Sequence, residues 1–233
     1  MLYIITVSRI RTTMNLEDLL QRAEVWRGGG RSPTSGFASG YPALDSLLNG
    51  GWPPGALVEI LSAHRGIGEL RLLLPVLATL TREKRWLAFV APPYLPYAPA
   101  LERAGVRLDR VLQVYPRTHT DTLWVLEQTL RSGSAVLAWP QTADARGLRR
   151  LQLAAEAGDS LGFLFRRPEA GRESSPAAVR LRLTPARTAT GLSIEVLKRR
   201  GGWPTGPIDL EVMHALALSG FSETGTGNLH PRA

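Results

Sequence analysis

Apolar and polar positions along this chain follow two different periods. Five short, almost wholly apolar runs predict buried strands, over residues 56–61, 85–92, 110–116, 134–140 and 160–167. The segments between them space apolar residues three and four apart, which predicts helices over 43–48, 69–82, 120–132 and 145–158, and one ending near Gly105. We expect Thr120 or Asp121 to cap the helix over 120–132. Pro75 should kink the second or mark its true first turn.

The last part of the core has a different pattern. Residues 178–186 and 192–200 alternate apolar and polar side chains around the turn sequence RTATG, which predicts an antiparallel hairpin. Strands that alternate with helices and then end in a hairpin indicate an α/β fold, with a mostly parallel twisted sheet flanked by helices. We expect this core over 37–210. An N-terminal arm of a short helix, a strand and a Gly/Ser/Pro linker would precede it (1–36), and a C-terminal tail would follow (211–233).

The connection after the first buried strand, SAHRGIGELRLLLP (62–75), lies where a nucleotide-binding protein carries its phosphate loop. Two glycines keep the tight turn, but a phosphate loop then needs a lysine and a hydroxyl group, and Gly68 and Glu69 stand at those places. A carboxylate there would repel phosphate. This degenerate loop predicts no ATP binding by the usual route. The alternative to a binding loop is a plain strand–helix connection whose anion is an internal carboxylate. Its candidate residues are Ser62, His64, Arg65, Gly66, Gly68 and Glu69.

The other parts of a nucleotide-hydrolysing site are also missing. APPYLPY follows the second strand, where a catalytic glutamate would stand, and the fourth strand ends in Ala138, Trp139 and Pro140, where an acid for magnesium would stand. The four histidines match no metal-ligand spacing, and there is no G-x-S-x-G motif. We expect no catalytic residue, no metal and no cofactor, and therefore a protein that is not an enzyme.

The charge is unevenly distributed. The formal net charge is +8, and residues 141–205 hold twelve Lys/Arg against six Asp/Glu. A basic face favours an acidic partner, nucleic acid first, although an arginine-rich composition alone does not require one. Lys198, Arg199 and Arg200 end the second hairpin strand shortly before Trp203. These four are candidate contacts for phosphate or for a partner protein; the alternative is a solvated strand end.

Five aromatic residues follow strand ends or lie in Pro/Gly loops: Trp52, Tyr94, Tyr97, Trp139 and Trp203. They form an aromatic binding surface if they share one face, and are otherwise core residues.

The composition also limits the compartment. The chain has no cysteine, which excludes disulfides and zinc–thiolate sites. No run approaches 18 apolar residues, so no membrane span is predicted. The arginines of MLYIITVSRIRTT follow its apolar run, which is the wrong order for a signal peptide. We expect a cytoplasmic protein.

Several segments resemble the RecA recombinases. SGYPALDSLLNGGWPPGALVEIL resembles the approach to their phosphate loop, and TDTLWVLEQTLRSGSAVLAWP resembles the helix and strand that end at the magnesium-associated acid. EVLKRRGGWP resembles a late strand whose two lysines reach a neighbouring subunit's nucleotide; Lys198 and Arg200 fall on those positions. The arm, with Val25 and Trp26, resembles the segment through which RecA protomers polymerise, which implies a RecA-like core and self-association. Only short polar connections (141–147 and 168–176) stand where DNA-binding loops would be.

Over about residues 15–210 the chain is similar to the ImuA family, RecA-like proteins encoded with mutagenic translesion polymerase components. GWPPGALVEIL, GIGELRLLLP, FVAPPYLPYAPAL, LRRLQLAAEAG and LKRRGGWP are typical of it. The resemblance implies a non-catalytic accessory protein of SOS-induced translesion DNA synthesis that binds the polymerase-like ImuB, with RecA and DNA as further candidate partners. Two alternatives stay open: a SulA-like inhibitor that binds the division GTPase, since the family is also related to SulA, and an atypical ATPase.

Overall fold

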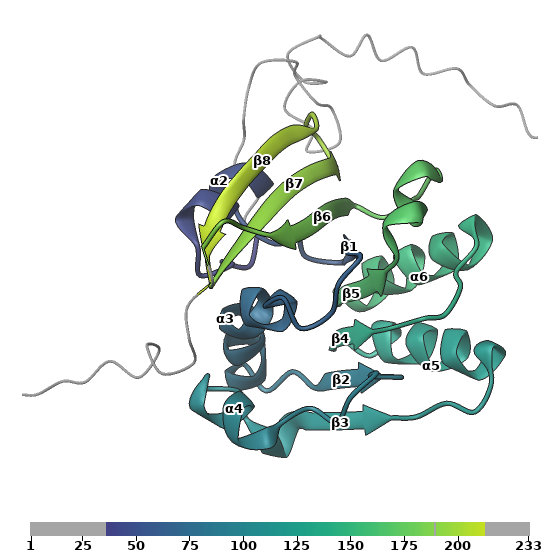
Figure 1. Cartoon of the computed structure of the whole chain (residues 1–233). Helices are drawn as coiled ribbons and strands as arrows, with labels where there is room; N and C mark the ends of the chain where they lie inside the picture. The colour runs from purple at the N-terminus through teal and green to yellow at the C-terminus, as the bar shows by residue number, and fades with distance from the viewer. Residues whose placement is uncertain (1–35, 189, 213–233) are drawn as a thin grey trace, which may run out of the picture. The chain divides into compact units, whose positions relative to one another are not determined.

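The sheet is organised around β1 (Ala56–Leu61), whose six residues are all buried. The computed structural model describes residues 36–188 and 190–212, and there eight strands lie in the order β3-β2-β4-β5-β1-β6-β7-β8 (Figure 1). The first six strands in the chain run parallel, and the last two are antiparallel. Their bounds are β2 Leu87–Val90, β3 Val111–Val114, β4 Ala135–Ala138, β5 Leu161–Arg166, β6 Val179–Pro185, β7 Gly191–Arg199 and β8 Thr205–Glu211.

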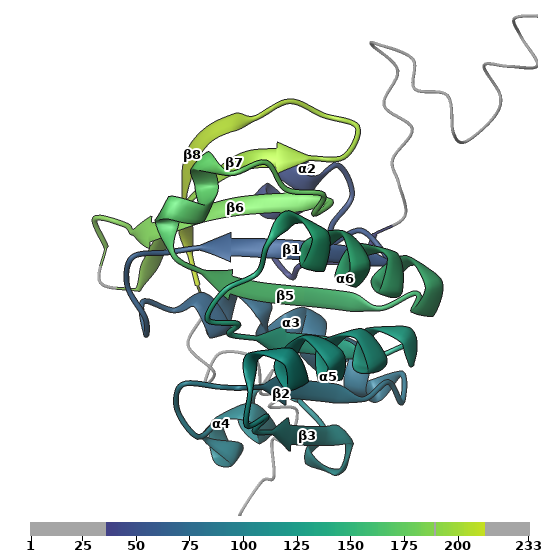
Figure 2. The ribbon, with the colours of Figure 1, turned by 90° about the vertical axis from the view of Figure 1, so that its right-hand side faces the viewer.

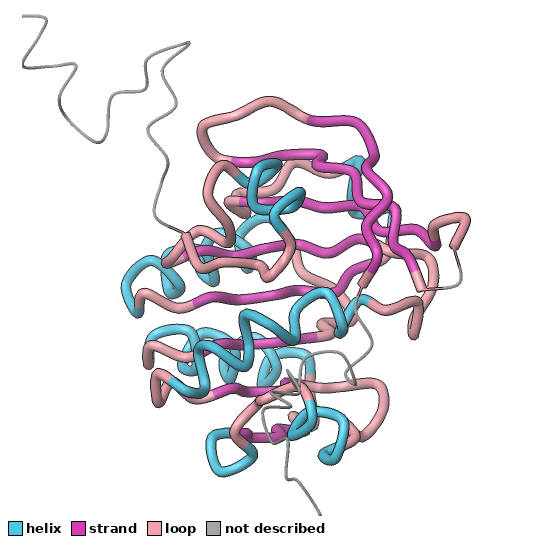
Figure 3. Tube along the Cα trace, turned by 90° about the vertical axis from the view of Figure 1, so that its left-hand side faces the viewer, coloured by secondary structure: helices cyan, strands magenta, loops and turns pink. Residues whose placement is uncertain are grey.

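Helices cover both faces of the parallel part of the sheet, because each crossover must return the chain to the start of the next strand. On one face α2 (Pro42–Leu48), α3 (Glu69–Arg82) and α4 (Ala98–Arg103) enclose the larger core, and this side faces the viewer in Figure 3. On the other face α5 (His119–Arg131) and α6 (Ala145–Gly158) enclose a second core, seen in front of the sheet in Figure 2. Short 3-10 turns occupy Leu108–Arg110 and Pro168–Arg172. The α/β class with a late antiparallel hairpin is thereby confirmed.

Local interactions explain where the helices begin. Thr118 caps α5 by accepting a hydrogen bond from the Asp121 backbone N–H at 3.1 Å, and the Asp121 carboxylate accepts from the Thr118 N–H, which forms a capping box. The predicted caps Thr120 and Asp121 are therefore wrong, because residue 118 supplies the hydroxyl and residue 121 the reciprocal carboxylate. Asp144 caps α6 through the Gly147 N–H at 2.7 Å.

Pro75 lies inside α3 and does not mark its first turn, because the helix already begins at Glu69. A proline has no N–H to donate to the carbonyl four residues earlier. That carbonyl, of Arg71, accepts a hydrogen bond from the Tyr41 hydroxyl at 3.3 Å. A side chain from another element therefore satisfies the acceptor that the helix leaves open.

The strand β8 was not predicted. Residues 205–211 contain a glycine and a proline, and the strand pairs with β7 at the edge of the sheet, where such residues are tolerated. Ile208 and Leu210 still pack against the larger core. Glu211 and the buried Val212, which the domain prediction assigned to the tail, thus belong to the described body.

Some predictions lie outside the described residues, namely most of the arm, with its candidate contacts Val25 and Trp26, and the tail beyond 212. None of the helices in residues 36–188 and 190–212 combines the length and apolar composition needed to cross a lipid bilayer.

Candidate functional site

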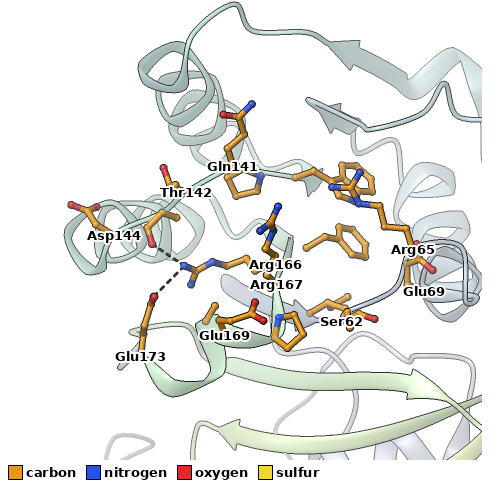
Figure 4. Close-up of a pocket in the computed structure, with 18 of the residues that line it drawn as sticks. Ser62, Arg65, Glu69, Gln141, Thr142, Asp144, Arg166, Arg167, Glu169 and Glu173 are labelled. Carbon is orange, nitrogen blue, oxygen red and sulfur yellow. Dashed lines mark hydrogen bonds and ion pairs between the residues drawn. The ribbon is translucent and has the colours of Figure 1, made fainter.

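A large open cavity lies at the carboxyl ends of β1, β4 and β5, with a volume of about 1630 Å³. Its walls come from the loop after β1, the segment after β4 and the segment that ends β5, so residues far apart in the sequence meet there (Figure 4). Of the predicted loop residues, Ser62, His64, Arg65 and Glu69 line it. The two polar connections 141–147 and 168–176 supply much of the remaining lining. A sheet of this kind presents ligand sites at this edge.

The Glu69 carboxylate occupies the backbone donors of the glycine loop. Its Oε1 accepts a hydrogen bond from the Gly66 N–H at 2.8 Å, and its Oε2 accepts from the Gly68 N–H at 3.2 Å. These are the donors that a phosphate would need, and they stand at the N-terminus of α3. The loop therefore carries its own anion, a carboxylate from its own chain.

The two glycines hold left-handed backbone conformations, with φ of 75° at Gly66 and 111° at Gly68. A Cβ on Gly68 would also lie 3.1 Å from a methyl carbon of Val212. A lysine at position 68 would consequently be strained and would push against the end of the described chain. The backbone at position 68 therefore disfavours the lysine that a phosphate loop carries there.

A buried ion cluster lies behind the cavity, and no signal in the sequence pairs its members. Glu59 of β1 is fully buried, and its carboxylate lies 2.5 Å from Arg166 Nη1 and 2.7 Å from Arg180 Nε. Arg166 also donates to the Ala143 carbonyl and pairs with Glu173. The cluster thus ties β1, β5 and β6 to the two segments that wall the cavity.

The predicted basic strand end lies toward the amino-terminal ends of the parallel strands, away from the cavity. Arg199 pairs with Val179, which is in register with Val58 near the start of β1, whereas the glycine loop follows the end of β1. Lys198 donates to the Ser175 carbonyl at 2.6 Å, and burial, together with Arg180 nearby, lowers its pKa. Arg200 pairs with Glu156 at 2.6 Å.

The loop and the basic strand end are therefore separate places. Both cations that match the RecA-like lysines already have partners within the chain.

The predicted aromatic surface does not form as one face. Trp52 is fully buried and meets Phe163 edge to face, while Trp139 stacks on Phe165 with ring centroids 4.6 Å apart. Tyr94, Tyr97 and Trp203 are exposed. Trp203 follows the basic strand end, whereas the two tyrosines lie in the connection between β2 and α4. The condition for an aromatic surface is therefore not met, and the core alternative holds for Trp52.

Exposed apolar side chains are instead concentrated around the edge strand β3. Seven of the ten exposed large hydrophobic residues in the described chain come from positions 86–115. We define the β3-edge surface by the five that lie in β3, just beyond it or in the β2–α4 connection, namely Tyr94, Leu95, Tyr97, Leu112 and Tyr115. The Ala91 N–H donates to the Val114 carbonyl, which brings the start of this connection beside the end of β3. The signal in the sequence was the run PPYLPY, whose apolar residues fit neither period.

The β2–α4 connection is also stiff. Ala91 begins it with φ of 50°, a left-handed conformation that costs an alanine about 1 kcal/mol. Pro92, Pro93 and Pro96 then fix φ within the connection. Tyr94, Leu95 and Tyr97 are 72%, 76% and 68% exposed. The chain therefore holds three large apolar side chains in solvent on a constrained backbone.

Comparisons with known proteins identify the family. Residues 55–162 match the family described as cell division inhibitor SulA. The SulA protein of Pectobacterium carotovorum is 30% identical over 145 residues, which cover 60% of this chain and 84% of that protein. The chain belongs to the SulA family. The SulA protein of Edwardsiella piscicida is 33% identical over 62% of this chain and 76% of its own length. That of Photorhabdus laumondii is 36% identical, but the match spans only 63% of its length.

These matches overturn the predicted role in translesion DNA synthesis and DNA repair. They also overturn the predicted partners, ImuB first and RecA and DNA after it. The assignment to the ImuA family is not supported. Most of the segments that carried it are strands, helices and turns of the fold, and a shared fold does not determine a partner. The better-supported reading is the SulA alternative.

Proposed function

We propose that this member of the SulA family inhibits cell division by binding the division GTPase, and that it is not an enzyme. The observation that supports this proposal most is the match to the family of cell division inhibitors. The matches to the relatives span 63% to 84% of their lengths, so the activity is carried over as a proposal.

The occupied glycine loop favours a binding protein over an enzyme. Glu69 fills the two N–H donors that would hold a phosphate. The segment after β4, at Trp139 and Pro140, has no acid to hold magnesium. Without these groups, neither positioning nor charge stabilisation of a transferring phosphate is available.

The β3-edge surface is the face that best suits a protein partner. β3 pairs only with β2 within the described sheet, and it is four residues long. Clustered exposed apolar residues mark interaction sites more often than single ones do. Because the prolines already restrict the β2–α4 connection, little conformational entropy would be lost when Tyr94, Leu95 and Tyr97 become buried.

The finer description of the fold as a RecA-like core belongs to the same proposal. It is supported by a glycine loop between the central strand β1 and α3, and by the cavity at the carboxyl end of that strand. A core of this kind that has lost its phosphate chemistry would keep its surfaces for binding.

The proposal is tested by producing the full chain in a rod-shaped bacterium and measuring cell length by microscopy. We expect filamentous cells, because an inhibited division GTPase leaves septation blocked while growth continues. Purified chain should also lower the amount of GTPase polymer that sediments in the presence of GTP. Normal cell length at protein levels verified by blotting, together with unchanged sedimentation, would refute the proposal.

A further inference from the structure

The cavity at the carboxyl ends of β1, β4 and β5 has not been assigned a ligand. A second, smaller cavity of about 300 Å³ adjoins it and shares Arg65, His119, Trp139 and Gln141 with it; the two together are called the groove. The main cavity exceeds the roughly 300–1,000 Å³ of typical small-molecule pockets. Its size suits a segment of polypeptide better than a single small metabolite.

The charges in the groove fall into two groups. Most of the lining carboxylates already have partners: Glu69 with the glycine N–H groups, Asp144 with the Gly147 N–H, and Glu173 with Arg166. Glu169 makes no ion pair or hydrogen bond with another described residue.

Three exposed arginines, Arg65, Arg117 and Arg167, likewise lack a partner among the described residues. Figure 4 shows Arg65 and Arg167 reaching the cavity from two different segments. Three unpaired arginines against the one unpaired carboxylate of Glu169 leave the unpaired charge in the groove net positive.

Aromatic rings form part of the floor between these arginines. Phe89, Trp139 and Phe165 stack in a row, with centroid separations of 6.4 Å and 4.6 Å and interplanar angles of 9° and 7°. Trp139 and Phe165 line the cavity together with Ile60. The groove therefore offers an apolar floor bordered by free guanidinium groups, which pair well with carboxylates.

We infer that this groove binds an acidic peptide segment of a partner protein, with an apolar side chain on the aromatic floor and flanking carboxylates on Arg65 and Arg167. A nucleic acid is the competing occupant, because its phosphates would pair with the same free arginines, and the test below distinguishes the two. A nucleotide phosphate fits less well, because Glu69 holds the loop donors. The inference rests on the groove alone and does not depend on the division activity.

The test uses the full chain and a fluorescein-labelled, amidated pentapeptide of sequence Glu-Asp-Phe-Asp-Glu. The matched control peptide is Gln-Asn-Phe-Asn-Gln, and binding is followed by fluorescence anisotropy. We expect the acidic peptide to bind at least about tenfold more tightly than the neutral one, and less tightly as salt is raised. The double variant Arg65→Gln/Arg167→Gln should bind the acidic peptide about tenfold more weakly than the wild type does. Arg187→Gln, at an exposed arginine outside the groove, should leave its affinity unchanged.

Thermal melting of each variant checks that it is folded. We expect melting temperatures near that of the wild type, because both arginines are exposed and their side chains make no ion pair or hydrogen bond with another described residue. Three outcomes would overturn the inference. They are equal binding of the two peptides, wild-type affinity in the double variant, and displacement of the peptide by ATP or a deoxythymidine decamer at lower concentrations than by unlabelled acidic peptide.

Discussion

The glycine loop and the β3-edge surface differ in how far the rest of the chain supplies their interactions. At the loop, the donors that would hold a ligand already bond to Glu69, and the buried Glu59 cluster holds the strands behind it. At the β3 edge, large apolar side chains remain in solvent on a proline-rich connection. The backbone donors of the loop are satisfied without a ligand, whereas the β3-edge surface gains free energy if a partner covers it.

This difference indicates how a fold with nucleotide-site geometry can serve as a binding protein. A glycine turn between a strand and a helix leaves N–H groups at the helix N-terminus, and these need an acceptor. A carboxylate one residue away supplies it at Glu69. The sheet then remains available to present surfaces elsewhere, as it does at β3.

The largest expected effect on stability is at the cluster behind the loop. Glu59→Gln leaves the Arg166 and Arg180 guanidinium groups without their shared buried counter-charge, which should lower the free energy of unfolding by about 3 kcal/mol. Urea denaturation measures this value. As a control, Glu156→Gln, which breaks the exposed pair with Arg200, should cost under about 1 kcal/mol. Equal losses in the two variants would mean that the loop region does not depend on its buried pairs.

A smaller effect is expected at the loop itself. Glu69→Ala frees the Gly66 and Gly68 N–H groups, and the loss of two charge-assisted hydrogen bonds at a partly exposed site should cost about 1–2 kcal/mol. Added phosphate should then raise the melting temperature of this variant but not that of the wild type. Glu83→Ala, at the other end of α3, serves as the control. If phosphate leaves Glu69→Ala unaffected, the donors are not an internally filled anion site.

The smallest effect concerns pH and lies away from both regions. Hydrogen bonds from Arg131 and Arg150 lower the pKa of Glu127 below its ordinary value of 4.5. The stability that this carboxylate contributes is therefore fully present above pH 4.5 and is lost as the pH falls through the lowered pKa. Glu127→Gln should be less stable than wild type by under about 1 kcal/mol at pH 7, and the gap should close in acid. A gap that widens in acid would contradict this assignment.

Local patterns predicted the parallel strands and the helices that flank them, because an apolar run and a helical spacing each depend only on residues close together in the sequence. The capping box of α5 was also readable, as Thr118 and Asp121 stand three residues apart. So was β8, where Ile208, Leu210 and Val212 alternate, although Gly206 and Pro207 obscured the strand.

The candidate site was less predictable, because its energetics depend on pairs distant in the sequence. Glu59 meets Arg166 and Arg180 across more than 100 residues, and nothing near Glu59 indicates these partners. The sequence placed Tyr94 and Tyr97 in a loop but could not separate them from buried aromatics such as Trp52, since exposure follows from the packing of the whole sheet.

The most direct test of the account is the affinity of the purified chain for the purified division GTPase, measured by biolayer interferometry. Leu95→Ser removes an exposed apolar side chain from the β3-edge surface, and Leu153→Ser removes a comparable one from α6. We predict that Leu95→Ser weakens binding by at least about tenfold, as expected for a leucine that becomes buried in the complex, and that Leu153→Ser binds as wild type does. Wild-type affinity in the Leu95→Ser variant, or no binding by the wild-type chain, would contradict the account.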